Sequence, residues 1–307
     1  MSAQPHPLPD SARARPSPLG AWILALRPRT LGAALVPVAV GSAVGSAEGQ
    51  FQPSIALACL AAAVLLQLAA NLTNDAVDFL AGIDSETRRG PQRVTQAGLI
   101  PARSVLRAAG LALGLGACVG AYLVWSGGVP ILLIGVTSIA AAAAYSAGPF
   151  PLASHGLGEL AAFVFFGLIA VTGTAYLHSG SFSVMALLAS LPVAFLVSNL
   201  MLVNNLRDIE SDHAAGKRTL AVRLGPRSMR RGYGVSLAFA YAAPLGLWAL
   251  DPGSFRVFAP WLSLPLAAPL LRVVWQARTE QDFQRALVGT ARLHLVYGLL
   301  LALGLLA

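Results

Sequence analysis

Long apolar segments recur along almost the whole chain and limit what it can fold into. Most of them are close to the roughly 20 residues that a helix needs to cross a bilayer. Charged residues make up only 11% of the chain, whereas a soluble domain carries roughly 25%. The sequence therefore predicts an all-α polytopic membrane protein, a bundle of about nine transmembrane helices around a central cavity. The predicted spans cover residues 22–46, 54–79, 104–125, 129–146, 158–178, 183–206, 230–250, 257–275 and 286–307.

The start of the chain differs from the rest because it is rich in Pro, Ser, Ala and Arg and carries no apolar period. We expect a disordered tail over residues 1–20 and a single transmembrane domain over residues 21–307. Intrinsic disorder needs low hydrophobicity and high charge, and residues 21–307 have neither.

The distribution of basic residues predicts the orientation in the membrane. The chain has 21 Lys and Arg and a net charge of +8. All of them except Arg256 lie in the tail, or in and beside the connections after the second, fourth, sixth and eighth segments. Such an excess of cations is typical of cytoplasmic loops, so it gives no reason to expect a nucleic-acid partner. We expect a multi-pass protein of the cell inner membrane, with a cytoplasmic N-terminus, a C-terminus on the opposite side and a cavity that opens to the cytoplasm.

Acidic residues are scarce, and seven of the 13 fall in two short clusters. The pattern Asn74-x-x-x-Asp78 ends the second segment, and Asn204-x-x-x-Asp208 ends the sixth, 130 residues later. A basic stretch follows each pattern. The repetition predicts a remote internal duplication with two related sites that face each other. The first cluster contains Asp75, Asp78, Asp84 and Glu86, and the second contains Asp208, Glu210 and Asp212.

The two clusters have the chemistry of a site for a metal ion and a phosphate. A carboxylate at membrane depth costs about 2.5–3.5 kcal/mol, so several on one helix face need a compensating partner. Mg²⁺ is suitable because it prefers carboxylate and amide oxygens and keeps substrate phosphates in its shell. Arg93, Lys217 and Arg218 follow the clusters and can pair with phosphate oxygens. With an apolar bundle behind it, this pattern predicts a lipid diphosphate as the ligand.

Two other interpretations stay open at this point. Charges at helix ends are often only solvated at the interface, or they form structural Asp–Arg pairs. A cation-coupled transporter also uses intramembrane carboxylates, usually near the membrane midplane in broken helices. The acids of this chain lie at the ends of apolar segments and beside Arg-rich stretches, which favours the diphosphate.

At these residues the chain resembles the UbiA superfamily of intramembrane prenyltransferases. Residues 71–100 are similar to the first aspartate-rich motif of that family, and residues 204–225 to the second. Residues 26–41 and 145–167 resemble the branch that prenylates 1,4-dihydroxy-2-naphthoate in menaquinone synthesis. Relatives that act on 4-hydroxybenzoate often carry Tyr-x-x-x-Lys, whereas no such Lys follows Tyr145. The resemblance thus implies the naphthoate acceptor, with 4-hydroxybenzoate and homogentisate as alternatives.

The resemblance also implies a reaction. Two Mg²⁺ ions would bind the diphosphate of a polyprenyl diphosphate, and an allylic cation would develop as the diphosphate leaves. The ring carbon that bears the carboxylate would attack this cation and lose CO₂, giving demethylmenaquinol. The family's first motif has a further Asp after Asp78, where this chain has Gly82 and, two residues later, Asp84. Glu159 either faces the site or caps a helix, and Tyr145 either orients the substrate or anchors the membrane interface.

The site residues that the resemblance implies have four roles. The expected catalytic acids are Asp78, Asp208 and Asp212. The expected metal ligands are Asn74, Asp75, Asp78, Asp84, Asp208 and Asp212. The diphosphate is expected to be bound by Arg93, Lys217 and Arg218, and the substrate pocket to be lined by Asn71, Tyr145, Glu159 and Asn204.

Overall fold

The computed structural model describes residues 16–80, 93–146 and 150–306, and within these ranges every regular element is a helix. Seven helices of the described part are long and apolar enough to cross a membrane. The protein is therefore an all-α polytopic membrane protein, as the apolar segments predict. The number of about nine spans stays a prediction, because one described helix contains two of the predicted segments and another has only 16 residues.

The first predicted span is wrong as a single helix, because the chain bends at Arg27. Helix α1 (Pro18–Leu26) ends there, a 3₁₀ turn η1 (Pro28–Thr30) follows, and α2 (Gly32–Ala47) begins after it. Arg27 has a left-handed backbone conformation with a φ of 50°. Pro28, which follows it, disfavours a helical conformation at Arg27. The predicted tail lies outside the described residues up to position 15, and its last three residues belong to α1.

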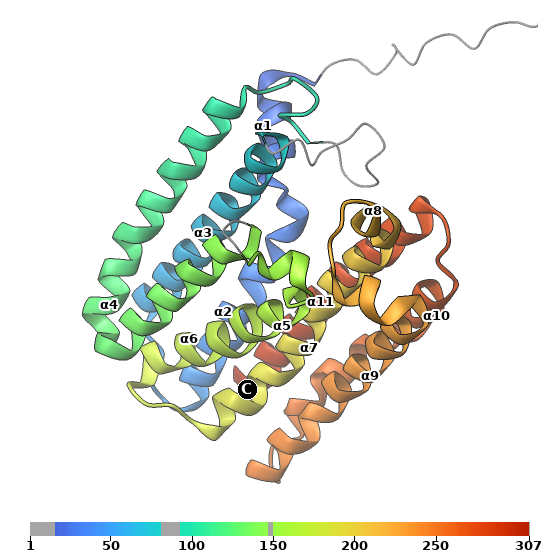
Figure 1. Ribbon diagram of the computed structural model, residues 1–307. Coiled ribbons are helices and arrows are strands. Elements are labelled where there is room, and N and C mark those ends of the chain that lie inside the picture. Colours follow the sequence, from blue (N-terminus) through green and yellow to red (C-terminus); the bar gives the residue numbers. More distant parts are fainter. Residues whose placement is uncertain (1–15, 81–92, 147–149, 307) are drawn as a thin grey trace, which may run out of the picture.

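Helices α3 (Pro53–Leu80) and α4 (Ala102–Ser146) pack against each other along one side of the molecule (Figure 1). The 45 residues of α4 would span about 67 Å as one straight helix, which is twice the thickness of a bilayer core. The helix bends at Gly128, which has a φ of 68° and a ψ of −153°, and Pro130 follows. Only glycine adopts such a conformation without strain. The bend lies between the third and fourth predicted spans.

Helices pack closely where the fifth predicted span meets α7 (Val184–Arg207). This span consists of α5 (Gly158–Ala161), the π-helical η3 (Ala162–Ile169) and α6 (Ala170–Ser179), and the 3₁₀ turn η2 (Leu152–His155) precedes it. Gly167 of η3 lies so close to α7 that a methyl group there would overlap with Ala194. Small residues let two helix backbones approach closely within a membrane.

The C-terminal part of the chain completes the bundle. After α7 come the short α8 (Ile209–Ala214) and α9 (Leu220–Leu250), which bends at Gly225. The eighth predicted span begins as a 3₁₀ helix, η4 (Phe255–Ser263), and continues as α10 (Leu264–Gln276). The last helix is α11 (Glu280–Leu306).

The core lies where α2, α7, α9 and α11 meet. Helices α2, α7 and α11 contact one another, and α9 packs against α7. Tyr233 and Tyr297 are fully buried there, and their hydroxyl groups bond to Thr290 Oγ1 at 3.0 Å and to the carbonyl oxygen of Ala240 at 2.6 Å. In a membrane interior every polar group needs such an internal partner. This core holds the end of α7, where the second acidic cluster lies.

Candidate active site

The second acidic cluster lies at the end of α7 and in α8. The guanidinium of Arg207 donates from Nε and Nη2 to the two carboxylate oxygens of Asp208, both at 2.7 Å. The backbone N–H of Asp212 donates to the carbonyl oxygen of Asp208 at 2.8 Å, so the two acids are one helical turn apart. Lys217 Nζ lies 3.3 Å from Asp212 Oδ1. Each carboxylate therefore has a cation beside it, and each offers further lone pairs to a ligand.

The loop after α8 folds back, so its basic residues stay beside the acids. The backbone N–H of Lys217 donates to the carbonyl oxygen of Asp212 at 2.9 Å, and that of Arg218 donates to Ser154 at 2.8 Å. Gly156 has a φ of 79°, and a Cβ added there would lie 3.1 Å from the carbonyl oxygen of Arg218. The turn before α5 thus lies directly against the loop that carries the two predicted diphosphate ligands.

Glu159, near the start of α5, is buried between α5 and α7 with only 8% of its surface exposed. Asn205 Nδ2 donates to Glu159 Oε1 at 2.9 Å, and Ser198 Oγ donates to the carbonyl oxygen of Glu159 at 3.0 Å. Oε2 has no hydrogen-bond partner among the described residues. The carboxylate is thus held by α7 and does not serve as a helix cap.

Tyr145, at the end of α4, lies in the same neighbourhood. Its hydroxyl group donates to Sδ of Met201 on α7 at 3.7 Å. A Cβ added to Gly158 of α5 would lie 3.4 Å from this hydroxyl oxygen. The hydroxyl also interacts electrostatically with the carboxylates of Glu159 and Asp212. Residues of α4, α5, α7 and α8 therefore converge beside the second cluster.

The first acidic cluster, at the end of α3, is organised differently. Asp75 is buried, with 1% of its surface exposed. Its carboxylate accepts the backbone N–H groups of Val94 at 3.2 Å and Thr95 at 3.1 Å, and also the Thr95 hydroxyl group. These contacts give Asp75 a structural role, and its expected role as a metal ligand stays a prediction. Three donors already surround the carboxylate, which anchors the chain at residues 93–95.

Asn71 also serves the fold. Its Nδ2 donates to the carbonyl oxygen of Leu26 at 3.3 Å and to Thr30 Oγ1 at 3.1 Å, while its Oδ1 accepts from Gln67 at 3.3 Å. The side chain is buried and ties α3 to the bend between α1 and α2. This position differs from the expected place of Asn71 in a substrate pocket.

Arg93 follows the undescribed segment after α3, and its side chain contacts the last part of that helix at Asn74, a predicted metal ligand. Its buried guanidinium donates from Nη1 to the carbonyl oxygen of Asn74. The side chain of Asp78 and the whole of Asp84 lie outside the described residues, so their roles stay predictions. The end of α3 and the short α8 both lie towards the upper side of Figure 1, which puts the two clusters at the same end of the bundle.

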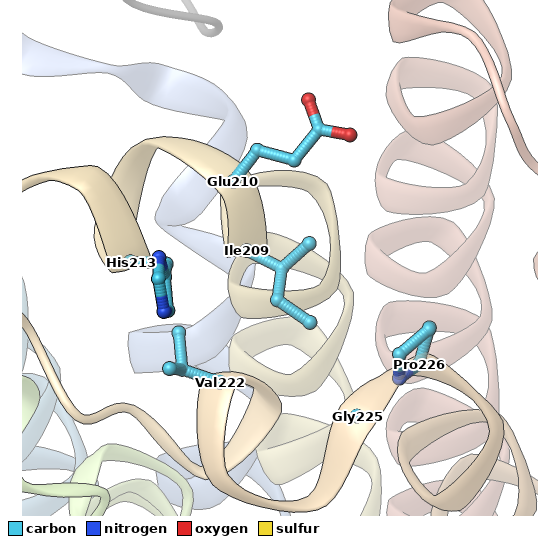
Figure 2. Close-up of a pocket in the computed structure, with 6 residues that line it drawn as sticks. All are labelled: Ile209, Glu210, His213, Val222, Gly225 and Pro226. Carbon is cyan, nitrogen blue, oxygen red and sulfur yellow. The ribbon is translucent and has the colours of Figure 1, made fainter.

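A pocket of about 430 Å³ lies beside α8 and the first turns of α9 (Figure 2). The side chain of Glu210 points away from those of His213 and Val222 in this view. Neither Asp208 nor Asp212 lines the pocket, so it is a neighbour of the acidic cluster and not the site of the two acids. Its lining residues are Ile209, Glu210, His213, Val222, Gly225 and Pro226.

The donor set of the second cluster suits Mg²⁺. Among the described residues, no three Asp, Glu, His or Cys side chains lie close enough to hold a metal ion between them. Mg²⁺ is, however, commonly held by one or two carboxylates together with water and substrate phosphates. Asp208 and Asp212 supply two carboxylates, and the partly buried amide of Asn204 makes no hydrogen bond to another described residue. These oxygen donors fit the ion.

Thr95 and Asn205 organise the site, although sequence reasoning gave neither a role. Their contacts join residues 20 and 46 positions apart, across segments whose approach no local pattern reveals. The sequence does hold a hint for Asn205. When the two Asn-x-x-x-Asp patterns are aligned, Asn205 stands at the position of Asp75. Both residues bind a neighbouring segment.

An apolar helical bundle with acidic and basic residues at one end of its helices is suited to a ligand with a charged head and an apolar tail. The chain belongs to the UbiA prenyltransferase family, whose profile matches residues 34–296. It is therefore an integral membrane prenyltransferase.

Named relatives and solved structures agree with this family. The chain is 38% identical to the 1,4-dihydroxy-2-naphthoate octaprenyltransferase of Escherichia coli (strain K12). The similarity extends over 268 residues and covers 84% of each protein. The chain is 37% identical over 250 residues to the enzyme of that name from Mycobacterium tuberculosis, covering 81% of this chain and 82% of the relative. The fold is similar to that of a UbiA homolog from Aeropyrum pernix K1, with a TM-score of 0.68, 19% identity and coverage of 89% and 96%. It is also similar to a UbiA homolog from Archaeoglobus fulgidus bound to GPP and Mg²⁺, with a TM-score of 0.63, 16% identity and coverage of 91% and 98%.

Proposed function

We propose that the protein transfers the polyprenyl group of a polyprenyl diphosphate to 1,4-dihydroxy-2-naphthoate, with loss of CO₂ and release of diphosphate, giving demethylmenaquinol. The observation that carries the proposal is the cluster of Asp208, Asp212 and Lys217 at the end of α7, beside an apolar bundle. The naphthoate acceptor is supported by the relatives of that name at 38% and 37% identity.

The acids and cations bind the head of the prenyl donor. Bound Mg²⁺ supplies positive charge that makes the diphosphate a better leaving group. Lys217 and Arg218, on the loop beside Asp212, pair with the diphosphate oxygens, and Arg93 does so from beside the end of α3. Asp75 and Asn71 position the ends of α1 and α3. The proposed ligands of two Mg²⁺ ions are Asn74, Asp78, Asp84, Asn204, Asp208 and Asp212.

The prenyl transfer itself needs few protein groups. The C1–O bond of the prenyl donor breaks, and its electron pair leaves with the diphosphate. The ring carbon that bears the carboxylate forms the new bond to C1, and the bond to the carboxylate then breaks, so CO₂ leaves and the ring recovers its electron pair. The apolar interior of the bundle keeps water away from the allylic cation. Tyr145 and Glu159 orient the acceptor ring.

The topology proposed from the loops places this chemistry at the inner face of the cell membrane. The end of α3 and the short α8 lie at one end of the bundle, and the excess of Lys and Arg in the sequence assigns that end to the cytoplasm. The cavity accordingly opens to the cytoplasm, where both soluble acceptor and diphosphate product exchange. The N-terminus is cytoplasmic, and the C-terminus is on the opposite side of the membrane.

An acceptor panel tests the proposal. Purified protein in detergent receives Mg²⁺, an octaprenyl diphosphate and one of three acceptors, namely 1,4-dihydroxy-2-naphthoate, 4-hydroxybenzoate or homogentisate. Diphosphate release is measured together with the mass of the product. We expect a prenylated product lacking the mass of CO₂ only with the naphthoate. Transfer to another acceptor, or diphosphate release that does not require Mg²⁺, would contradict the proposal. Solute accumulation in proteoliposomes without diphosphate release would favour a transporter.

A further inference from the structure

The buried carboxylate of Glu159 is only partly hydrogen-bonded. The carboxylate is buried, yet only Oε1 has a hydrogen-bond donor, from Asn205. Oε2 has none among the described residues. A buried carboxylate oxygen without a donor is costly, so a group of this kind needs a reason or a partner. The partner must be a hydrogen-bond donor, because an ionised carboxylate can only accept.

Hydrogen bonds from α7 hold Glu159 in place. Asn205 holds Oε1, and Ser198 holds the backbone of the same residue at its carbonyl oxygen. Gly158 leaves room beside it, since a Cβ there would lie 3.4 Å from the Tyr145 hydroxyl oxygen and 3.9 Å from Asn205 Nδ2. Tyr145 and Asn205, which lie beside Glu159, are only partly buried.

The two substrates of the proposed reaction differ in what they could offer to Oε2. The prenyl donor has an apolar tail and an anionic head, and neither donates a hydrogen bond. The aromatic acceptor carries two ring hydroxyl groups. We propose that Glu159 is a specificity-determining residue whose Oε2 accepts a hydrogen bond from one ring hydroxyl of the acceptor. This inference rests on the proposed function and adds to it the recognition of the acceptor.

The variant Glu159→Gln tests this directly. Asn205 Nδ2 donates and so keeps the amide oxygen of the new side chain at the Oε1 position, which places an NH₂ donor where Oε2 accepted. The ring hydroxyl then meets a neutral amide donor in place of a charged acceptor and loses the charge-assisted hydrogen bond that it donated, so we expect affinity for 1,4-dihydroxy-2-naphthoate to fall by about 10- to 100-fold. A naphthoate analogue lacking the recognised hydroxyl should bind both proteins equally, so both 1-hydroxy-2-naphthoate and 4-hydroxy-2-naphthoate are measured.

Binding is measured by quenching of tryptophan fluorescence, and turnover by product mass. Wild-type protein that binds the naphthoates but transfers no prenyl group would contradict the proposed function and leave this inference standing. Equal loss for all three naphthoates in Glu159→Gln, or no loss at all, would overturn the inference. The apparent affinity for the prenyl diphosphate should not change, because the donor does not touch Oε2.

Two further variants separate recognition from folding. Glu159→Asp keeps the charge but shortens the side chain by one methylene group, and should lose the same preference for the dihydroxy acceptor if it can no longer reach the hydroxyl. Ser198→Ala is the matched control, since it removes a hydrogen bond to the backbone of Glu159 and leaves the carboxylate in place. A loss of preference in Ser198→Ala equal to that in Glu159→Gln would show a structural effect and overturn the inference.

Discussion

The two acidic clusters resemble each other in sequence but use their side chains in opposite ways. In the first cluster, Asp75 is buried and accepts hydrogen bonds from the backbone at residues 94 and 95. At the equivalent position of the second cluster, Asn205 donates to the carboxylate of Glu159. Both residues hold a neighbouring segment against the end of their helix. Asp75 is therefore a structural group. We call Asp75 and Asn205 the clamping positions of the two clusters.

Asp208 and Asp212, which lie three and seven residues after Asn205, carry negative charge in the second cluster. Asp208 and Asp212 are paired with side chains, Arg207 and Lys217, which can be rearranged when an ion or a diphosphate binds. Backbone amides, as at Asp75, cannot move away without unfolding a segment. The same residue type thus stabilises the fold in one cluster and is available for chemistry in the other.

The largest effect is expected from Asp212→Asn. This change removes one of the two carboxylates of the second cluster, and loss of such an electrostatic contact typically costs about 10²- to 10³-fold in rate. We expect diphosphate release to fall by about 100-fold or more, with more Mg²⁺ needed for half-maximal activity and little change in thermal unfolding. Asp251→Asn is the control, because Asp251 is an exposed acid at the end of α9. Full activity of Asp212→Asn would remove the second cluster from the site.

The next effect, on stability, is expected from Asp75→Ala. The change leaves the amides of Val94 and Thr95 buried without their acceptor, and we expect unfolding to become easier by about 3 kcal/mol. Thermal unfolding in detergent checks this value. The Mg²⁺ concentration for half-maximal activity should stay the same in the fraction that remains folded. A clear rise in that concentration, with wild-type stability, would return Asp75 to the metal ligands.

Much of the fold could be predicted from the sequence because a bilayer imposes simple rules on apolar length and charge. The rules fail where backbone geometry intervenes. The first predicted span is broken because Pro28 follows Arg27, a signal that was visible in the sequence. The bend at Gly128 lies between two predicted spans, because Gly and Pro interrupt the apolar segment there.

The candidate site could be located from the sequence, but the task of each residue could not. Helical spacing puts Asn71, Asn74 and Asp75 on one face, and the sequence places all three in the site, Asn71 in the substrate pocket and the other two among the metal ligands. The structure distinguishes them by what lies opposite, since Asn71 meets the bend after α1 and Asp75 meets residues 94 and 95. Those partners come from segments 19 to 45 residues away, and no local pattern encodes their approach.

Replacing Asn205 by Asp, the residue at the equivalent position of the first cluster, tests the comparison further. Asn205→Asp would put a second carboxylate where the amide nitrogen now lies 2.9 Å from Glu159 Oε1. Like charges at this distance repel, so we expect about a 10-fold loss of acceptor turnover and a lower unfolding temperature. Asn205→Ala, which removes the donor without adding charge, should be milder in both measurements. Equal effects of the two changes would mean that the loss of the amide donor matters and the added charge does not.

The smallest effect is expected from substitution of Lys217. Its kinetics show whether Lys217 binds the diphosphate or only pairs with Asp212. The side chain of Lys217 is 34% exposed, so its ion pair adds at most about 1 kcal/mol to stability. If its main contact is the diphosphate, Lys217→Met should raise KM for the prenyl diphosphate by about 3- to 10-fold with kcat nearly unchanged, and Lys217→Arg should restore most of it. If Lys217 only neutralises Asp212, its removal should instead leave that KM unaltered and tighten Mg²⁺ binding, because the ion no longer competes with the ammonium group. Steady-state kinetics over a range of both ligands separates the two cases, and only the first supports a diphosphate held between α8 and its following loop.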